Sequence, residues 1–153
     1  MNDAERDEND KRRMAMAVLA AASAEELRGA VSCVTDLGAV EDLKMPETGL
    51  VMLRGRIGGD GALFNIGEAT VTRAVVRLNT GVIGYGVRLG RDAAAARDAA
   101  IIDALWQSSR MRGHIETAVL QPISERQRRD RDARSRQIAA TRVDFFTLAR
   151  EAT

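Results

Sequence analysis

The fold of this chain is decided by residues 68–89, which read EATVTRAVVRLNTGVIGYGVRL. Within this stretch, residues 68–78 and 82–89 are rich in β-branched side chains and alternate between apolar and polar positions, as half-buried strands do. Asn79-Thr80-Gly81 lies between the two runs, and glycine supplies the positive φ that a tight turn needs. Residues 68–89 are therefore predicted to form an antiparallel hairpin.

A strand is also predicted before this hairpin. Residues 50–57 alternate in the same way, and the glycine-rich residues 58–61 follow them. These glycines match no phosphate-binding spacing, so an ordinary hairpin turn is preferred over a ligand-binding loop. Residues 39–45, before Pro46, are a candidate for one more strand at an edge of the sheet. The chain is thus expected to contain an antiparallel meander of three to four strands.

Helices are predicted on the N-terminal side of the meander. Residues 2–13 are almost all polar and mix both charge signs, so we expect residues 1–13 to be a disordered leader and residues 14–153 to form a single domain. The first helix is expected to begin near Asp10. Ser23-Ala24-Glu25-Glu26 has the spacing of a capping box, which predicts the start of a second, short helix.

Two more helices are predicted after the meander. Asp92 is a suitable N-cap for a helix over residues 93–111. This helix has an expected buried stripe made of Ala99, Ile102, Leu105 and Trp106. After Pro122, Ser124 opens a capping-box pattern for a charged helix that carries the arginines of residues 126–136. Helices, then a meander, then helices predict an α+β fold.

The charge balance and the aromatic content narrow the functional class. The chain has 23 Lys and Arg against 22 Asp and Glu, a formal net charge of +1, which argues against a nucleic-acid binder held by bulk positive charge. One Trp, one Tyr and three Phe are too few for a platform that stacks single-stranded bases. No apolar run is long enough to span a membrane, and the N-terminus does not have the form of a signal peptide. We therefore expect a cytoplasmic protein.

The single cysteine and the single histidine exclude a disulfide framework and a Cys/His zinc site supplied by this chain alone. Cys33 lies among Val31 and Val34 of the second predicted helix and is expected to be a small buried residue. His114 has no nucleophile or carboxylate in a recognisable motif beside it, so we interpret it as a solvent-facing or packing residue. Catalysis by a Cys-His pair requires that Cys33 and His114 meet in space.

Three arginines form a candidate phosphate site. Arg73 and Arg77 lie four residues apart on one face of a predicted strand, and Arg91 follows the next strand. Guanidinium groups near one edge of the sheet can bind a polyphosphate through paired hydrogen bonds. The alternative is a solvated sheet face on which these arginines pair with Glu68 and Asp92.

Two features of the C-terminal part leave alternatives open. Residues 126–136 are rich in arginine, but Asp130 and Asp132 dilute the charge, so a solvated, salt-bridged helix face is preferred over a patch that reads RNA. Phe145 and Phe146 are adjacent and cannot both point inward on a simple amphipathic element. Either one of them packs on the core while the other contacts a partner, or both fold onto the core.

Several short motifs lie in order along residues 14–150. They are Glu47-Thr48-Gly49-Leu50-Val51, Gly58-Gly59, Gly67-Glu68-Ala69-Thr70-Val71-Thr72-Arg73-Ala74, Gly90-Arg91-Asp92, Ile102-Asp103-Ala104-Leu105 and Arg142-Val143-Asp144-Phe145-Phe146-Thr147. This series resembles the PhnG family, the small G subunits of the bacterial carbon–phosphorus lyase core complex. The residues up to Arg13 match nothing in that family.

The resemblance implies a role in the use of phosphonates as a phosphorus source. In that family the G subunit acts with the H, I and L subunits to join methylphosphonate to the ribose C1′ of ATP, which displaces adenine and gives α-D-ribose 1-methylphosphonate 5-triphosphate. The I subunit carries nucleosidase-like chemistry, L is of the ATP-binding-cassette type, and the radical SAM subunit J later breaks the C–P bond. G, H, I and J form a two-fold symmetric hetero-oligomer.

The resemblance therefore predicts a subunit of a transferase that is not catalytic alone. ATP and methylphosphonate are substrates of the complex, and no cofactor or metal is expected on this chain by itself. No residue of the G subunit is carried over as catalytic. We expect Arg73, Arg77 or Arg91 to face the phosphates, and Val143, Phe145 and Phe146 to dock on the I subunit, the nearest partner. A binding or regulatory module that uses the Arg-rich helix is the alternative.

Overall fold

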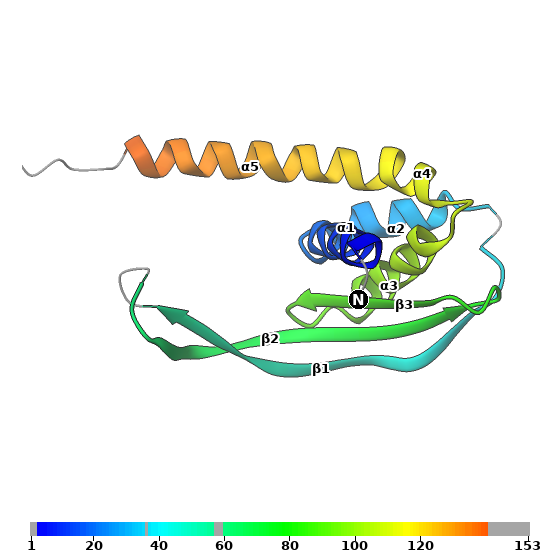
Figure 1. The fold of residues 1–153 in the computed structure, drawn as a ribbon, viewed down its shortest axis with the longest axis horizontal. Coiled ribbons are helices and arrows are strands. Elements are labelled where there is room, and N and C mark those ends of the chain that lie inside the picture. Colours follow the sequence, from blue (N-terminus) through cyan, green and yellow to red (C-terminus); the bar gives the residue numbers. More distant parts are fainter. Residues whose placement is uncertain (1–2, 36, 57–59, 141–153) are drawn as a thin grey trace, which may run out of the picture.

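The computed structural model describes residues 3–35, 37–56 and 60–140. It contains one antiparallel sheet with the strand order β1-β2-β3, formed by β1 (Val40–Arg56), β2 (Leu63–Leu78) and β3 (Ile83–Leu89). The helices lie on one face of this sheet (Figure 1). The predicted α+β fold is confirmed, with three strands in the meander.

The hairpin predicted for residues 68–89 is present as β2 and β3. Gly81 has a φ of 85°, and the amide of Leu78 donates to the carbonyl of Val82 at 2.9 Å. The two segments predicted before the hairpin form one strand, β1. Its register against β2 shifts on both sides of Lys44, close to Pro46, and the strand is bulged there. A bulged edge strand tolerates proline, which has no amide hydrogen to donate to a neighbour.

Helix α3 (Ala93–Gln107) packs directly on β2 and β3. A Cβ at Gly84 or Gly86 would collide with backbone carbonyl oxygens of α3, so only glycine allows the helix to lie so close to β3. The side chain of Asp92 caps α3 by accepting from the amide of Ala95 at 2.9 Å, as predicted. The predicted stripe is buried, and α3 ends at Gln107 rather than at residue 111.

Helices α1 (Asp3–Ala20) and α2 (Ala24–Ser32) cover α3 from the outside. The structure describes a helix from Asp3 onward, where the sequence predicted a disordered leader. The polar side chains of this segment have partners elsewhere in the chain, since Glu8 pairs with Arg112 and Arg12 with Asp103. The capping box predicted at the start of α2 is confirmed by both of its hydrogen bonds.

The chain ends, as far as it is described, in a nearly continuous helical segment. Helix α4 (Arg112–Ile115), a π-helical turn η1 (Glu116–Leu120) and α5 (Gln121–Ala140) follow one another. The prediction that the charged helix begins at a Ser124 cap is wrong. The wider π turn lies just before Pro122, where a regular helix would lose one hydrogen bond and crowd the proline ring. No helix among the described residues is long and apolar enough to cross a membrane.

Candidate functional site

Arg73 and Arg77 lie on the face of the sheet opposite the helices, as their spacing predicts. Arg77 donates to Glu41 Oε2 from Nε at 3.1 Å and from Nη2 at 2.6 Å. Arg73 is held more loosely, since its Nη2 lies 3.9 Å from Glu47 Oε1. The carboxylate partners therefore come from β1. They are not the Glu68 and Asp92 that the sequence suggested.

The three candidate arginines do not converge on one point. Arg77 lies opposite Ile83, the first residue of β3, whereas Arg91 follows the last residue of that strand. The length of β3 separates these two positions by roughly 20 Å at about 3.3 Å per residue. Arg73 lies opposite Val87 and is thus closer to the Arg91 end. Arg77 therefore lies at the end of β3 that is farther from Arg91.

Cys33 and His114 line the same pocket, which has a volume of about 530 Å³. Cys33 is exposed at the C-terminal end of α2, so the prediction of a buried cysteine is wrong. His114 is exposed, which agrees with a solvent-facing histidine. In the part of the chain that the structure describes, no hydrogen bond joins the two side chains, and no group of three or more His, Cys, Asp or Glu could hold a metal ion.

The candidate docking residues Val143, Phe145 and Phe146 lie outside the described residues. Their expected contact with a partner stays a prediction. The charged helix that precedes them is described up to Ala140 and matches its predicted character. Arg126 forms ion pairs with Asp130 at 2.7 Å and with Glu26 of α2 at 2.6 Å.

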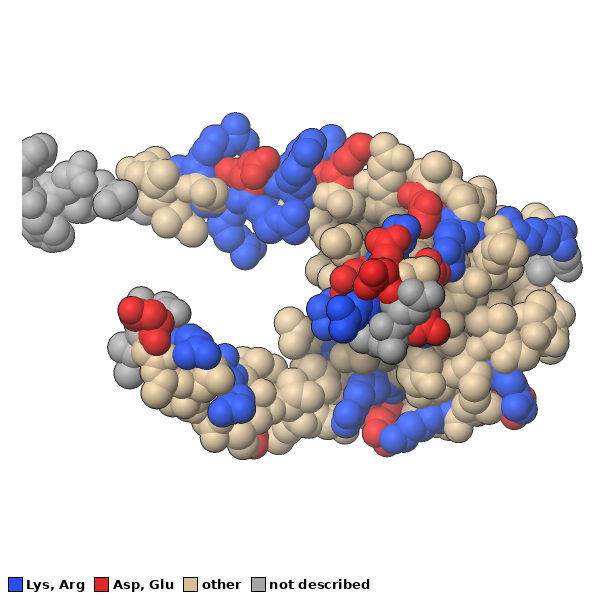
Figure 2. Space-filling model, viewed as in Figure 1, with Lys and Arg blue, Asp and Glu red and all other residues tan. Residues whose placement is uncertain are grey.

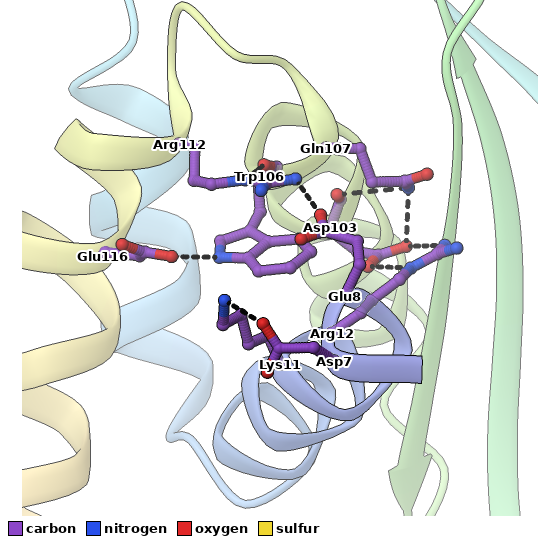
Figure 3. A network of polar contacts seen from close by, with 9 residues as sticks. All are labelled: Asp7, Glu8, Lys11, Arg12, Asp103, Trp106, Gln107, Arg112 and Glu116. Carbon is purple, nitrogen blue, oxygen red and sulfur yellow. Dashed lines mark hydrogen bonds and ion pairs between the residues drawn. The ribbon is translucent and has the colours of Figure 1, made fainter. Parts of the chain in front are cut away.

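A polar network centred on Asp103 joins α1 to α3 (Figure 3) and also reaches β3 through backbone groups. The carboxylate of Asp103 is 1% exposed and accepts from Arg12 Nε at 3.0 Å and Nη2 at 2.7 Å. It also accepts from the backbone amide of Tyr85 at 2.9 Å, while Gln107 Nε2 donates to the carbonyl of Ile83 at 2.8 Å. Side chains of α3 thus bind backbone amide and carbonyl groups at the free edge of β3, which protects this edge from pairing with another strand. The carboxylate raises the pKa of Arg12 above its ordinary value.

A second part of the network fixes the start of the C-terminal helical segment. The indole Nε1 of Trp106 donates to Glu116 at 3.1 Å, and the guanidinium of Arg112 lies 4.3 Å from the centre of the Trp106 ring. Arg112 also pairs with Glu8 of α1. These contacts hold α1 and η1 on α3. Because the polar groups are paired with one another, we assign the network a positioning role.

The sequence placed Asp103 in the Ile102-Asp103-Ala104-Leu105 motif without assigning it a role, and it did not single out Arg12. Asp103 had a detectable signal, since a carboxylate inside the apolar run of residues 101–106 needs a buried partner. Arg12 had no such signal, because it lies among many charges in a polar stretch.

Comparison with known proteins agrees with the motifs in the sequence. Residues 10–151 match the family described as "Phosphonate metabolism protein PhnG". A relative from Rhizobium meliloti (strain 1021), named alpha-D-ribose 1-methylphosphonate 5-triphosphate synthase subunit PhnG, is 49% identical over 140 residues. The matched region covers 92% of this chain and 89% of the relative. The chain belongs to the PhnG family of phosphonate metabolism proteins.

Proposed function

We propose that this chain is a subunit of an α-D-ribose 1-methylphosphonate 5-triphosphate synthase that acts in phosphonate breakdown. The observation that carries the proposal is the 49% identity, over 92% of the chain, to a protein named as a subunit of that synthase. The chain acts with the H, I and L subunits in a transferase reaction. This reaction joins methylphosphonate to the ribose C1′ of ATP and displaces adenine.

The chain contributes to this reaction as part of the assembly and is not catalytic alone. Cys33 and His114 share a pocket but form no hydrogen bond within the described residues, whereas an activated nucleophile needs a base within hydrogen-bond reach. We therefore assign the reactive groups to other subunits rather than to a Cys33–His114 pair. The H, I and J subunits are the core partners, with I nearest to this chain, and the assembly works in the cytoplasm, where its substrate ATP is found.

The exposed arginines of the sheet serve the triphosphate of substrate and product. Arg91 is exposed and forms no ion pair with any described residue, and Arg73 has only a distant carboxylate. Both can therefore exchange solvent for phosphate oxygens at little cost. Arg77 must first leave Glu41, so we expect it to contribute less. Val143, Phe145 and Phe146 dock on the I subunit.

Reconstitution tests the proposal. Purified H, I and L subunits are incubated with ATP and methylphosphonate, with and without this chain, and released adenine and ribosyl phosphonate are measured. We expect both products only when the chain is present. Equal product formation without it would contradict the proposed function. An Arg73→Gln, Arg91→Gln variant should lower the rate, while Arg13→Gln on exposed α1 serves as the matched control.

Docking of the C-terminal residues is tested separately. A Phe145→Ala, Phe146→Ala variant should recover less I subunit than the unmodified chain does. Normal recovery would exclude these residues as the main contact. An RNA-binding regulator is the less favoured function, and its signature would be salt-dependent retention of the chain on RNA without any effect on synthase activity.

A further inference from the structure

Half of the β1–β2 hairpin extends beyond α1, α2, α3 and β3 (Figure 1). β3 pairs with β2 only from Val71 to Arg77, so the segments 50–56 and 63–70 form a two-stranded ribbon without a third strand. We call these two segments the apolar ribbon. An isolated two-stranded hairpin is at best marginally stable in water. The ribbon is thus a surface that gains stability when a partner covers it.

Both faces of the apolar ribbon carry large apolar side chains. Leu50 and Met52 lie on one face and are 61% and 58% exposed. Strand alternation places Leu53 and Phe64 on the other face, where both are also exposed. A ribbon that faced water would alternate between apolar and polar residues, with one polar face. Exposed apolar groups on both faces indicate a protein interface.

Helix α5 extends past α1, α2 and α3 on the same side as the ribbon (Figure 1). Each residue from 128 to 140 is exposed, although most isolated helices of this length are marginal in water. This part of α5 has five arginines, which form no ion pair with any described residue: Arg128, Arg129, Arg131, Arg134 and Arg136. Only Asp130 and Asp132 oppose them, and Asp130 is already paired with Arg126. This surface is therefore complementary to carboxylates.

The cationic helix and the apolar ribbon border one open hollow (Figure 2). Ile123 and Gln127 are the buried residues of α5, and the same stripe continues at helical spacing through Asp130, Arg131 and Arg134. These two arginines therefore lie on the side of α5 that faces the hollow. The hollow is thus bordered by the exposed apolar side chains of the ribbon, among which Arg54 and Arg56 also lie, and by the arginines of α5.

We propose that this hollow receives a segment of another synthase subunit, which is apolar against the ribbon and carries carboxylates against α5. The proposal rests on the proposed function, because it requires an assembly. A second copy of this chain is a poorer occupant, since the acidic residues Asp7, Glu8 and Asp10 of its α1 are already paired within their own chain. A nucleic acid would satisfy the arginines but would leave the ribbon uncovered.

The ribbon is tested with the full chain co-expressed with the other subunits. A Leu50→Glu, Met52→Glu variant should lower the recovery of the partner subunits at least about tenfold, as removal of interface anchors does. Both side chains are solvent-exposed, so circular dichroism should show an unchanged fold. Met14→Glu, at an equally exposed apolar position on α1, is the matched control and should recover normal amounts. If the pair variant misfolds, Ile66→Ser provides the same test with a smaller change.

The cationic wall is tested with Arg131→Glu and Arg134→Glu, combined in one chain. We expect a similar loss of partner recovery, and recovery of the unmodified chain should fall as salt is raised. Arg13→Glu, on exposed α1, is the matched control.

The outcomes separate this inference from the proposed function. If the unmodified chain assembles and either double variant assembles as well as its control, the shared docking hollow is overturned and the proposed function stands. If the unmodified chain recovers no subunit, both fall. A dimer of the chain alone that Leu50→Glu, Met52→Glu abolishes would assign the ribbon to a second copy and also overturn the inference.

Discussion

Removal of the Asp103 carboxylate should destabilise the body of the protein more than any exposed charge does. In Asp103→Ala, Arg12 loses its ion-pair partner. Its side chain is 28% exposed and can be hydrated instead, so this part of the loss in stability is moderate. The amide of Tyr85 loses its acceptor at the edge of β3, which costs roughly 1–3 kcal/mol. We expect a total near 3 kcal/mol, at the low end for a broken buried pair. For a chain of this length that is a fall in Tm of about 6–12 °C.

A double-mutant cycle isolates the pair itself. Arg12→Ala leaves a buried carboxylate without its counter-charge and should cost about as much as Asp103→Ala. The double variant should be more stable than the sum of the two single effects predicts, with a coupling of about 2 kcal/mol. Urea unfolding of the full chain, followed by circular dichroism, measures all four proteins. Effects that add within about 0.5 kcal/mol would refute the pairing.

Three more predictions concern packing, an ion pair and a buried hydroxyl. Gly86→Ala should lower Tm by about 6–12 °C, on the order of an overpacking penalty of 3 kcal/mol, because its Cβ meets the α3 backbone. Gly29→Ala, where the space is open, should not lower Tm. The hydrogen bond and charge of Arg126 lower the pKa of Glu26. The pair therefore stabilises the fold above the ordinary carboxyl pKa, and this stabilisation is lost as pH falls through the folded pKa. Glu26→Gln should flatten the Tm profile between pH 7 and 3, on the order of the shift expected for one carboxylate. Thr72→Val should cost about 1–2 kcal/mol in urea unfolding, because the buried hydroxyl donates to the carbonyl that follows β3 at 2.7 Å.

The parts of the fold that local physics determines were predictable from the sequence. Residues 68–89 fold as predicted because strand alternation and a glycine turn act over a few residues. The capping box at Ser23 is likewise confirmed. The start of α1 was not predictable, because its polar residues are held by Arg112 and Asp103, which lie about a hundred positions away. Composition alone indicates disorder in such a stretch.

In the candidate site, too, local patterns were predictable and long-range contacts were not. A strand period of two places Arg73 and Arg77 on one face, and the structure agrees. Their partners Glu41 and Glu47 depend on the register of β1 against β2, which shifts near Pro46. Such shifts leave no reliable mark in the sequence, so the sequence could name the arginines but not their carboxylates. The distance between Arg77 and Arg91 also follows from the length of β3 and not from any motif.

The molecule separates into a part whose polar and apolar groups are satisfied and a part whose groups are not. Around Asp103 the buried charge and the strand edge are paired within the chain, so substitutions there act first on stability. On the apolar ribbon Leu50 and Met52 are exposed, and five arginines in the distal half of α5 form no ion pair with any described residue, so substitutions there act first on assembly. A variant such as Leu50→Glu, Met52→Glu should therefore keep its Tm while losing partners, and Asp103→Ala should lose Tm in the isolated chain. Loss of both properties together in the ribbon variant would mean that the ribbon belongs to the core.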